Sequence, residues 1–199
     1  MKKLSFFVLL IIVTLPSTAQ QKGKIRVGLD FGLGLPNIGY GISSAIDLRY
    51  NIFDNWNAGL RVNYGMLNKD LYFDSNMSST TTELVLSIMG VSDYYFNKQS
   101  KSLVPFLGIG LGQNYFQNIK LIQNKSSQII GYGVDIDNKW GGVLRGGFET
   151  KHFRMALEYY LIPASELVNA AIGTNTGITK NSYANLTVGF YLGGGKWKR

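Results

Sequence analysis

The chain of 199 residues has a formal charge of +8 and contains 24 glycines, one histidine and no cysteine. This length predicts a single domain. The lack of cysteine excludes a lipid-anchored lipoprotein, disulfides, cysteine nucleophiles and thiolate metal sites.

Residues 1–19 are predicted to be a cleaved signal peptide. Lys2 and Lys3 precede an apolar run from Leu4 to Leu15, and small residues follow up to Ala19. The run is shorter than the roughly 20 apolar residues of a membrane-spanning helix. We expect cleavage after Ala19, export, and one mature domain over residues 20–199. Removing Lys2 and Lys3 lowers the formal charge from +8 to +6.

Residues 24–35, KIRVGLDFGLGL, alternate between apolar residues and residues that are charged or glycine. A period of two predicts a strand with two different faces. The alternation recurs seven times, at residues 44–52, 57–66, 82–96, 103–115, 140–150, 153–161 and 183–192. The predicted fold is therefore all-β, an eight-stranded antiparallel up-and-down transmembrane β-barrel. A closed barrel is the form in which strands satisfy every backbone polar group in lipid.

The connections between these strands alternate in length. Short connections are expected at residues 53–55, 97–102 and 151–152, and longer ones at residues 36–43, 67–81, 116–139 and 164–180. Transmembrane barrels combine short periplasmic turns with long outer loops in this way. Residues 128–137 themselves alternate, which predicts either an extension of the sixth strand or a local hairpin.

The polar face of the strands carries charges of both signs. It holds five arginines and six carboxylates: Arg26, Asp30, Asp47, Arg49, Arg61, Glu83, Asp93, Arg145, Glu149, Arg154 and Glu158. Glycines share this face, which suits a crowded lumen better than an open surface. Buried charges need partners, and guanidinium groups pair well with carboxylates. Because eight strands leave an interior just wide enough for side chains, we expect a structural polar network that fills the lumen rather than a conduit.

Aromatic residues gather toward the two ends of the apolar face. They are Tyr50, Phe53, Trp56, Tyr94, Phe96, Phe148, Phe153 and Phe190 near the short turns, and Tyr64, Tyr115, Trp140 and Tyr159 near the long loops. Two such belts around an aliphatic band are typical of both membrane interfaces. The apolar face is thus predicted to contact lipid. The alternative is a soluble lipocalin-like barrel, whose apolar face surrounds a ligand.

The chain resembles the small eight-stranded outer-membrane β-barrel proteins of Bacteroidetes-type Gram-negative bacteria. The resemblance rests on the signal peptide and on the segments VGLDFGLGLP (27–36), VPFLGIGLG (104–112), RMALEYYL (154–161) and NLTVGFYL (185–192). It implies an outer-membrane location, contact with outer-membrane lipid, and the barrel-assembly machinery as a partner during biogenesis. Barrels of this family usually end on an aromatic residue in the last strand, whereas here GGGKWKR follows that strand.

No catalytic, cofactor or metal site is predicted. His152 lies in a predicted turn without a serine or aspartate placed to serve it. The glycines lie within strands and not in a phosphate loop, and Asp135 and Asp137 lack the spacing of an EF-hand. The basic excess is spread over loops and tails, which argues against nucleic acid.

The predicted function is that of a non-catalytic outer-membrane protein with a structural or surface-interaction role. Residues 117–139 and 164–180 are the candidate contacts for an extracellular partner, because variable function resides on loops over a rigid scaffold. The alternatives are a small-solute channel, a lipid-modifying enzyme and a soluble lipocalin-like binder.

Overall fold

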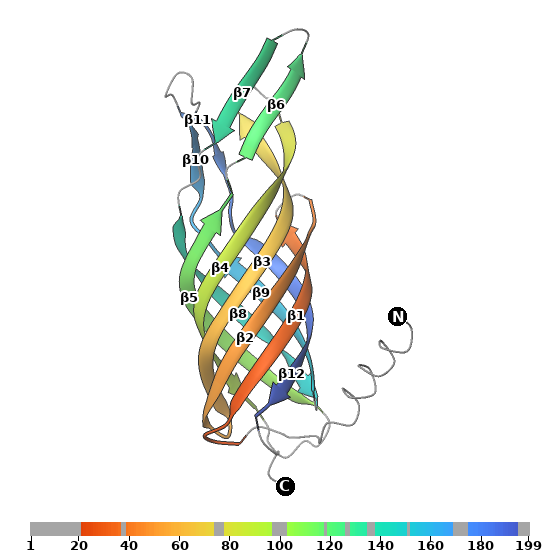
Figure 1. The fold of residues 1–199 in the computed structure, drawn as a ribbon, viewed down its shortest axis with the longest axis vertical. Coiled ribbons are helices and arrows are strands. Elements are labelled where there is room, and N and C mark those ends of the chain that lie inside the picture. The colour runs from red at the N-terminus through yellow and green to blue at the C-terminus, as the bar shows by residue number, and fades with distance from the viewer. Residues whose placement is uncertain are drawn as a thin grey trace, which may run out of the picture.

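Eight long strands form the body of the computed structural model, which describes residues 21–36, 39–73, 78–96, 103–117, 119–125, 128–134, 138–150, 152–168 and 175–194. These strands are β1 (Ile25–Pro36), β2 (Gly41–Phe53), β3 (Trp56–Phe73), β4 (Ser78–Tyr95), β5 (Val104–Phe116), β8 (Lys139–Thr150), β9 (Phe153–Leu161) and β12 (Tyr183–Gly193). They stand side by side around one axis (Figure 1). The predicted signal peptide lies outside the described residues.

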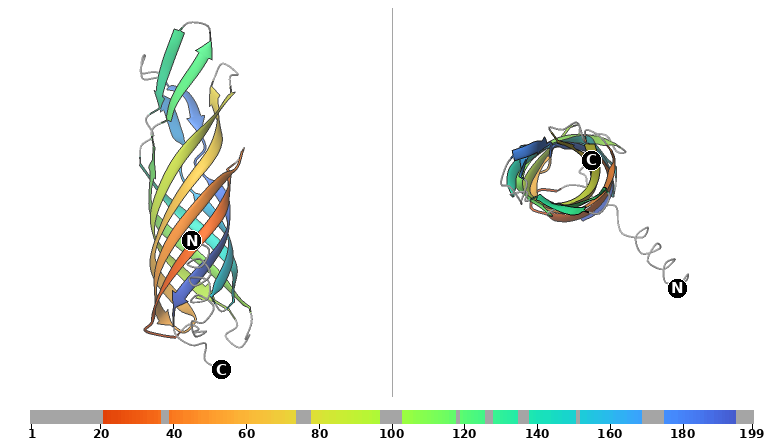
Figure 2. Two further views of the ribbon diagram at one scale, coloured as in Figure 1. Left: turned by 45° about the vertical axis from the view of Figure 1, so that its right-hand side comes forward. Right: turned by 90° about the horizontal axis from the view of Figure 1, so that it is seen from above.

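The strands close into a barrel. Each pairs antiparallel with the next one of the eight along the chain, and β1 pairs with β12. The ring is visible when the molecule is seen from above (Figure 2). Closure gives every strand two partners, so that no edge of the barrel is left unpaired. The predicted eight-stranded antiparallel barrel is confirmed. No helix among the described residues is long and apolar enough to cross a membrane.

The apolar face of the strands points outward. Leu29 is 43% exposed, whereas its neighbour Asp30 is 1% exposed, and the alternation continues along β1. Leu48 and Leu157 are likewise exposed, on β2 and β9. Successive side chains of a strand point to opposite faces, so one orientation determines the whole strand. This orientation contradicts the lipocalin-like alternative, which needs the leucines inside.

The long connections predicted at the outer end of the barrel contain further strands. The connection expected at residues 67–81 is mostly strand, because the pairing of β3 with β4 continues to Tyr72 and Ser78. Residues 116–139 contain the local hairpin of β6 (Ile119–Lys125) and β7 (Gln128–Val134). Residues 164–180 contain β10 (Ser165–Val168) and β11 (Asn175–Thr179), and β11 pairs with β3. Both hairpins lie beyond the barrel rim (Figure 1).

Inward glycines leave room for the charged side chains of the lumen. A Cβ atom on Gly189 would lie 1.8 Å from Asp30 Oδ1, and one on Gly108 would lie 2.0 Å from Asp93 Oδ1. Gly65 is different, because a Cβ atom on it would lie 3.9 Å from the nearest neighbouring atoms. The glycines at residues 108 and 189 are therefore required by the carboxylates that face them.

We predict that Gly189→Val destabilises the barrel, because the new side chain displaces Asp30 from its ion pairs. The expected loss is about 1–3 kcal/mol, as for other overpacked interiors. Urea unfolding in detergent micelles measures it. The matched control is Gly65→Val, which adds the same side chain where there is room. Equal losses of stability in the two variants would contradict the conclusion that Gly189 is required by Asp30.

Candidate functional site

The lumen is the site to which the predicted charged residues belong. The structure places all eleven of them inside the barrel, with exposed fractions of 3% or less. They come from β1, β2, β3, β4, β8 and β9, and each occupies an inward position of its strand. Side chains distant in sequence thus share one confined space.

A cluster around Arg61 forms the middle of this network. Its guanidinium group donates to Asp30 at 2.6 Å, to Asp47 at 2.7 Å and to Glu158 at 2.9 Å. Arg154 contacts the same two aspartates, Asp30 at 2.9 Å and Asp47. The aspartates therefore bridge two guanidinium groups. Such charge-assisted bonds are short and about twice as strong as neutral ones.

A second group lies toward the end at which β1 begins. Arg26 donates to Glu149 at 2.7 Å, and the Tyr95 hydroxyl donates to the same carboxylate at 2.8 Å. The Arg26 guanidinium also lies 3.8 Å from the centre of the Tyr191 ring. A cation over an aromatic face is stabilised by the ring quadrupole. Arg26 is therefore held by a carboxylate and by an aromatic ring.

Asn51 links two chain segments at this end of the barrel. Its amide nitrogen donates to the backbone oxygens of Gln21, at 3.0 Å, and Gly194, at 3.1 Å. The Gln21 amide in turn donates to the Gly194 carbonyl. The segments before β1 and after β12, which are neighbouring strands, are thus joined to each other at this end of the barrel.

Arg145 is bound more loosely than the other arginines. Its nearest carboxylate oxygens are those of Glu158 at 3.4 Å, Asp93 at 3.7 Å and Asp47 at 3.8 Å. Its three guanidinium nitrogens are buried and make no hydrogen bond to the described residues. Arg49 pairs more closely with two of these carboxylates, with Asp47 at 2.9 Å and Asp93 at 3.0 Å. Arg145 thus balances charge without fixing the geometry of its neighbours.

The ion pairs among the described residues are electrically balanced. Around Arg61 and Arg26 they join five guanidinium groups and five carboxylates: Arg26, Arg49, Arg61, Arg145 and Arg154 with Asp30, Asp47, Asp93, Glu149 and Glu158. Glu83 lies on β4 opposite Leu67, toward the outer end, and has interactions of its own. A neutral cluster is the condition under which ionised groups are kept in an interior.

An apolar layer, which sequence reasoning missed, fills the lumen toward the outer end. It consists of Leu67, Val85, Met89, Val91, Phe116, Val143 and Ile162, together with Tyr160 and Tyr183. The two tyrosine rings stack, with centroids 4.6 Å apart and planes 6° apart. The Tyr160 hydroxyl accepts a hydrogen bond from Arg61 at 3.4 Å. The tyrosines therefore join the apolar layer to the charged one.

The sequence of β4 contains a pattern that could have predicted this layer. Val85, Met89 and Val91 alternate in phase with Glu83, so the apolar residues of this strand lie on both faces. In the sequence this arrangement is visible only as an irregular alternation. Residues apolar on both faces indicate a strand covered on both sides.

The residues predicted as aromatic belts lie on the outside of the barrel. Eleven of the twelve are exposed, and Tyr115 is half-buried. Near the short turns, Phe153 packs on Phe190 with ring centroids 4.4 Å apart, and Tyr94 packs on Phe96 at 5.1 Å. Girdles of aromatic rings at this level suit a membrane interface.

His152 does not assemble a catalytic group with its described contacts. Its Nδ1 atom lies 3.3 Å from the Tyr191 carbonyl oxygen, and its ring centre lies 6.3 Å from that of Tyr191. A catalytic base needs a nucleophile within hydrogen-bond reach. Among the described residues, no three His, Cys, Asp or Glu side chains gather as a metal site. Asp135 and Asp137 lie outside the described residues.

Comparison with known proteins identifies the fold. No family model and no curated protein sequence matches the chain. Among solved structures, it is similar to the outer membrane protein OprG from Pseudomonas aeruginosa (14% identity, TM-score 0.64, 87% of this chain and 98% of that chain). It is also similar to a major outer membrane protein from Thermus thermophilus (12%, 0.52, 84% and 99%) and to Neisserial surface protein A (16%, 0.50, 86% and 99%). The chain thus has the fold of eight-stranded outer-membrane β-barrels.

Proposed function

We propose that the chain is exported by a cleaved signal peptide and works in the outer membrane as a non-catalytic barrel with a closed lumen. The barrel serves as a rigid scaffold, and its outer hairpins contact an extracellular partner. The single observation that carries this proposal is the filled interior. The ion pairs of the lumen, the stacked pair of Tyr160 and Tyr183, and the apolar layer succeed one another along the barrel.

The outward face supports insertion in lipid. A soluble protein rarely exposes a large continuous apolar patch, yet here exposed leucines, isoleucines and aromatics follow one another around the barrel. Leu111 and Ile109 on β5 are 64% and 63% exposed, and Leu157 on β9 is 59% exposed. Water would make this surface aggregate, whereas acyl chains solvate it. Outer-membrane lipid is therefore the proposed surrounding, and the assembly machinery is the proposed partner during insertion.

The outer hairpins support a role in surface interaction. The hairpin of β6 and β7 pairs only with itself among the described residues, and the hairpin of β10 and β11 is attached to β3. Both project from a barrel that is closed by pairing on all sides (Figure 2). Variable elements on a rigid frame are the usual place for recognition. We therefore assign contact with an extracellular partner to residues 117–139 and 164–180.

We predict that labelling of single cysteines in cells reveals which end of the barrel faces the outside. Lys180→Cys lies on the outer side and is exposed, so an impermeant maleimide should label it in intact cells. Lys22→Cys, exposed at the opposite end, should react only after the outer membrane is permeabilised. The native chain has no cysteine that would add background.

The control for this experiment is Leu157→Cys on the lipid face. It should remain unlabelled in membranes and react after the protein is unfolded in detergent. Rapid labelling of Leu157→Cys in a detergent-free preparation would mean that the outward face meets water. That result would overturn the membrane proposal.

We predict that the closed lumen passes no ions. Planar bilayers that contain the native barrel should show no stepwise conductance, because charged and apolar layers obstruct the interior. Stable open-channel steps would favour the small-solute channel instead.

We also predict that Arg61→Met is strongly destabilising. The change leaves Asp30, Asp47 and Glu158 without their shared partner, and breaking a buried ion pair costs about 3–5 kcal/mol. Arg26→Met is the matched comparison. It should lose less stability than Arg61→Met, because Arg26 pairs with the single carboxylate Glu149. The measurement is urea unfolding in micelles. A stability of Arg61→Met equal to that of the native protein would show that the network is not a structural plug.

A further inference from the structure

The outer part of β4 has an open edge on the side that faces away from β3. The ladder of β4 with β3 continues to the start of β4, whereas its ladder with β5 ends at Val85 and Phe116. One further bond, from the Gln117 amide to the Leu84 carbonyl at 3.0 Å, extends this contact by one residue. Among the described strands, none pairs with this edge over residues 78–82. Its sequence, SSTTT, contains neither a charge nor a proline that would block the addition of a strand.

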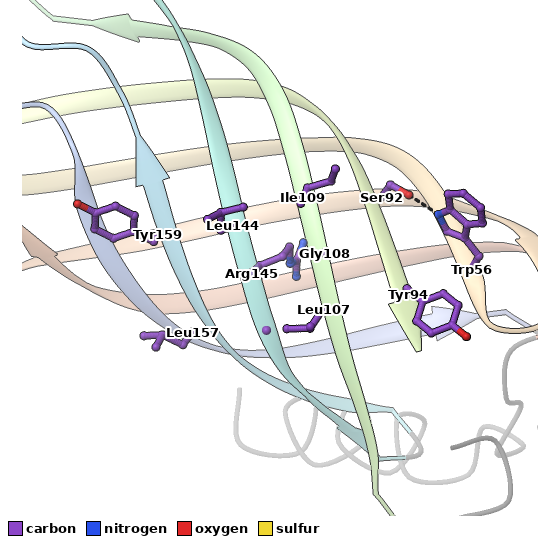
Figure 3. Close-up of a pocket in the computed structure, with 11 residues that line it drawn as sticks. Trp56, Ser92, Tyr94, Leu107, Gly108, Ile109, Leu144, Arg145, Leu157 and Tyr159 are labelled. Carbon is purple, nitrogen blue, oxygen red and sulfur yellow. Dashed lines mark hydrogen bonds between the residues drawn. The ribbon is translucent and has the colours of Figure 1, made fainter. Parts of the chain in front are cut away.

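The hairpin of β6 and β7 continues the register of the barrel wall below it. Ile109 of β5 and Leu144 of β8 form a pair on the outward face of this wall (Figure 3). Ten residues along both strands toward the outer end lie Ile119 and Val134, which pair with each other in the hairpin. The two ladders are thus separated by the same number of residues on each strand. β5 with β6, and β7 with β8, therefore form one interrupted ribbon.

The same register places β6 opposite the open edge of β4. Extending the ladder of β4 and β5 by three residues brings Thr82 opposite Ile119, the first residue of β6. The next four residues bring Ser78, the first residue of β4, opposite Gln123. β6 therefore has the length and the antiparallel direction that the open edge requires.

Both strands of the hairpin already lie near another strand. Cα atoms of β6 come within 8 Å of Cα atoms of β4, and those of β7 come within 8 Å of those of β10. The hairpin rises beyond the outer ends of β3 and β4 (Figure 1). A hairpin of two strands is marginally stable in water, whereas a third strand stabilises it. Pairing of β6 with β4 would thus stabilise the hairpin and cover the open edge at once.

We propose that the hairpin of β6 and β7 is a strap that closes onto β4, so that the ladder of β4 and β5 continues into a ladder of β4 and β6. The closed strap joins the outer strands into a single sheet beyond the rim, in the order β10, β11, β3, β4, β6 and β7. Its use in recognition rests on the proposed function, because the extracellular partner then meets one continuous sheet instead of two separate hairpins. Opening of the strap separates the two halves of that surface.

Chain connectivity favours β6 over a strand of another molecule as the occupant of the edge. Only residues 117 and 118 separate β5 from β6. Closing so short a connection costs little loop entropy. A strand from a partner or from a second copy would also lose its translational and rotational freedom. β6 is therefore the first strand to reach this edge.

The test is disulfide formation in the full barrel, purified and folded in detergent micelles. In the proposed register, Thr81 and Lys120 form a non-hydrogen-bonded pair with Cα atoms about 4.5 Å apart, a distance that a disulfide can bridge. Thr81→Cys with Lys120→Cys should therefore crosslink on mild oxidation. The matched control is Thr81→Cys with Ile122→Cys, whose diagonal separation of about 7–8 Å is too long. We expect the first pair to crosslink at least tenfold faster than the control pair.

Hydrogen exchange gives a second readout in a chain without added cysteines. Thr80 and Thr82 are an even number of residues from Leu84, so their amides point to the same side as its carbonyl, and a closed strap protects them from exchange. The amide of Thr81 points to β3 instead. Leu121→Pro removes the amide that would donate to Thr80, so it should abolish this protection. Leu121→Ala keeps that amide and should preserve the protection.

Equal crosslinking rates for the two cysteine pairs, or no crosslink in either, would overturn the inference. Rapid exchange of the Thr80 and Thr82 amides in the native chain would overturn it as well. Mobility on an unheated gel verifies that each variant is folded. Failure of the proposed function is seen separately, because the strap is tested in the purified barrel, whereas labelling of Lys180→Cys tests in cells whether this end faces the outside.

Discussion

Closure of the backbone hydrogen-bond ladder is the constraint on which the rest of this structure depends. Once β1 pairs with β12, each of the eight barrel strands has two neighbours and exposes only its two faces. Each residue of a barrel strand must then face either the lumen or the surroundings, because the period of a strand is two. An apolar outer face and a filled inner face follow together from this division.

The inner face shows how a small barrel keeps charges away from water. Five guanidinium groups and five carboxylates neutralise one another, and two aspartates, Asp30 and Asp47, each join more than one arginine. Within the part of the chain that the structure describes, the arrangement leaves Arg145 with ion pairs but no hydrogen bonds. Because the interior of eight strands is narrow, such a network occupies the space that a solute would need. This is the reason why the proposed function is that of a scaffold and not of a channel.

The outer face carries the features that relate the barrel to its surroundings. Its aromatic residues lie toward the two ends, and its aliphatic residues lie between them. The hairpins beyond the rim add a part that is not constrained by closure (Figure 1). In the proposed function, the lumen confers rigidity, the outer face contacts lipid, and the hairpins serve recognition.

The sequence by itself determined the number of barrel strands, their orientation and the set of inward charges. Alternation is a local property, so Leu29 and Asp30 could be assigned to opposite faces without knowledge of any partner strand. Only the tertiary structure decided which charges meet. Arg61 and Glu158 are 97 residues apart, and Arg26 and Glu149 are 123 residues apart, so their pairing depends on the register between distant strands.

The apolar layer and the outer hairpins were also decided by tertiary contacts. Val85 on β4 and Tyr183 on β12 belong to one cluster because barrel closure brings inward positions of distant strands together. The pairing of β11 with β3 joins residues 177 and 73, which no local pattern predicts. Short-range periodicity specifies the face of a residue, whereas its neighbours across the lumen depend on how the strands are staggered around the ring.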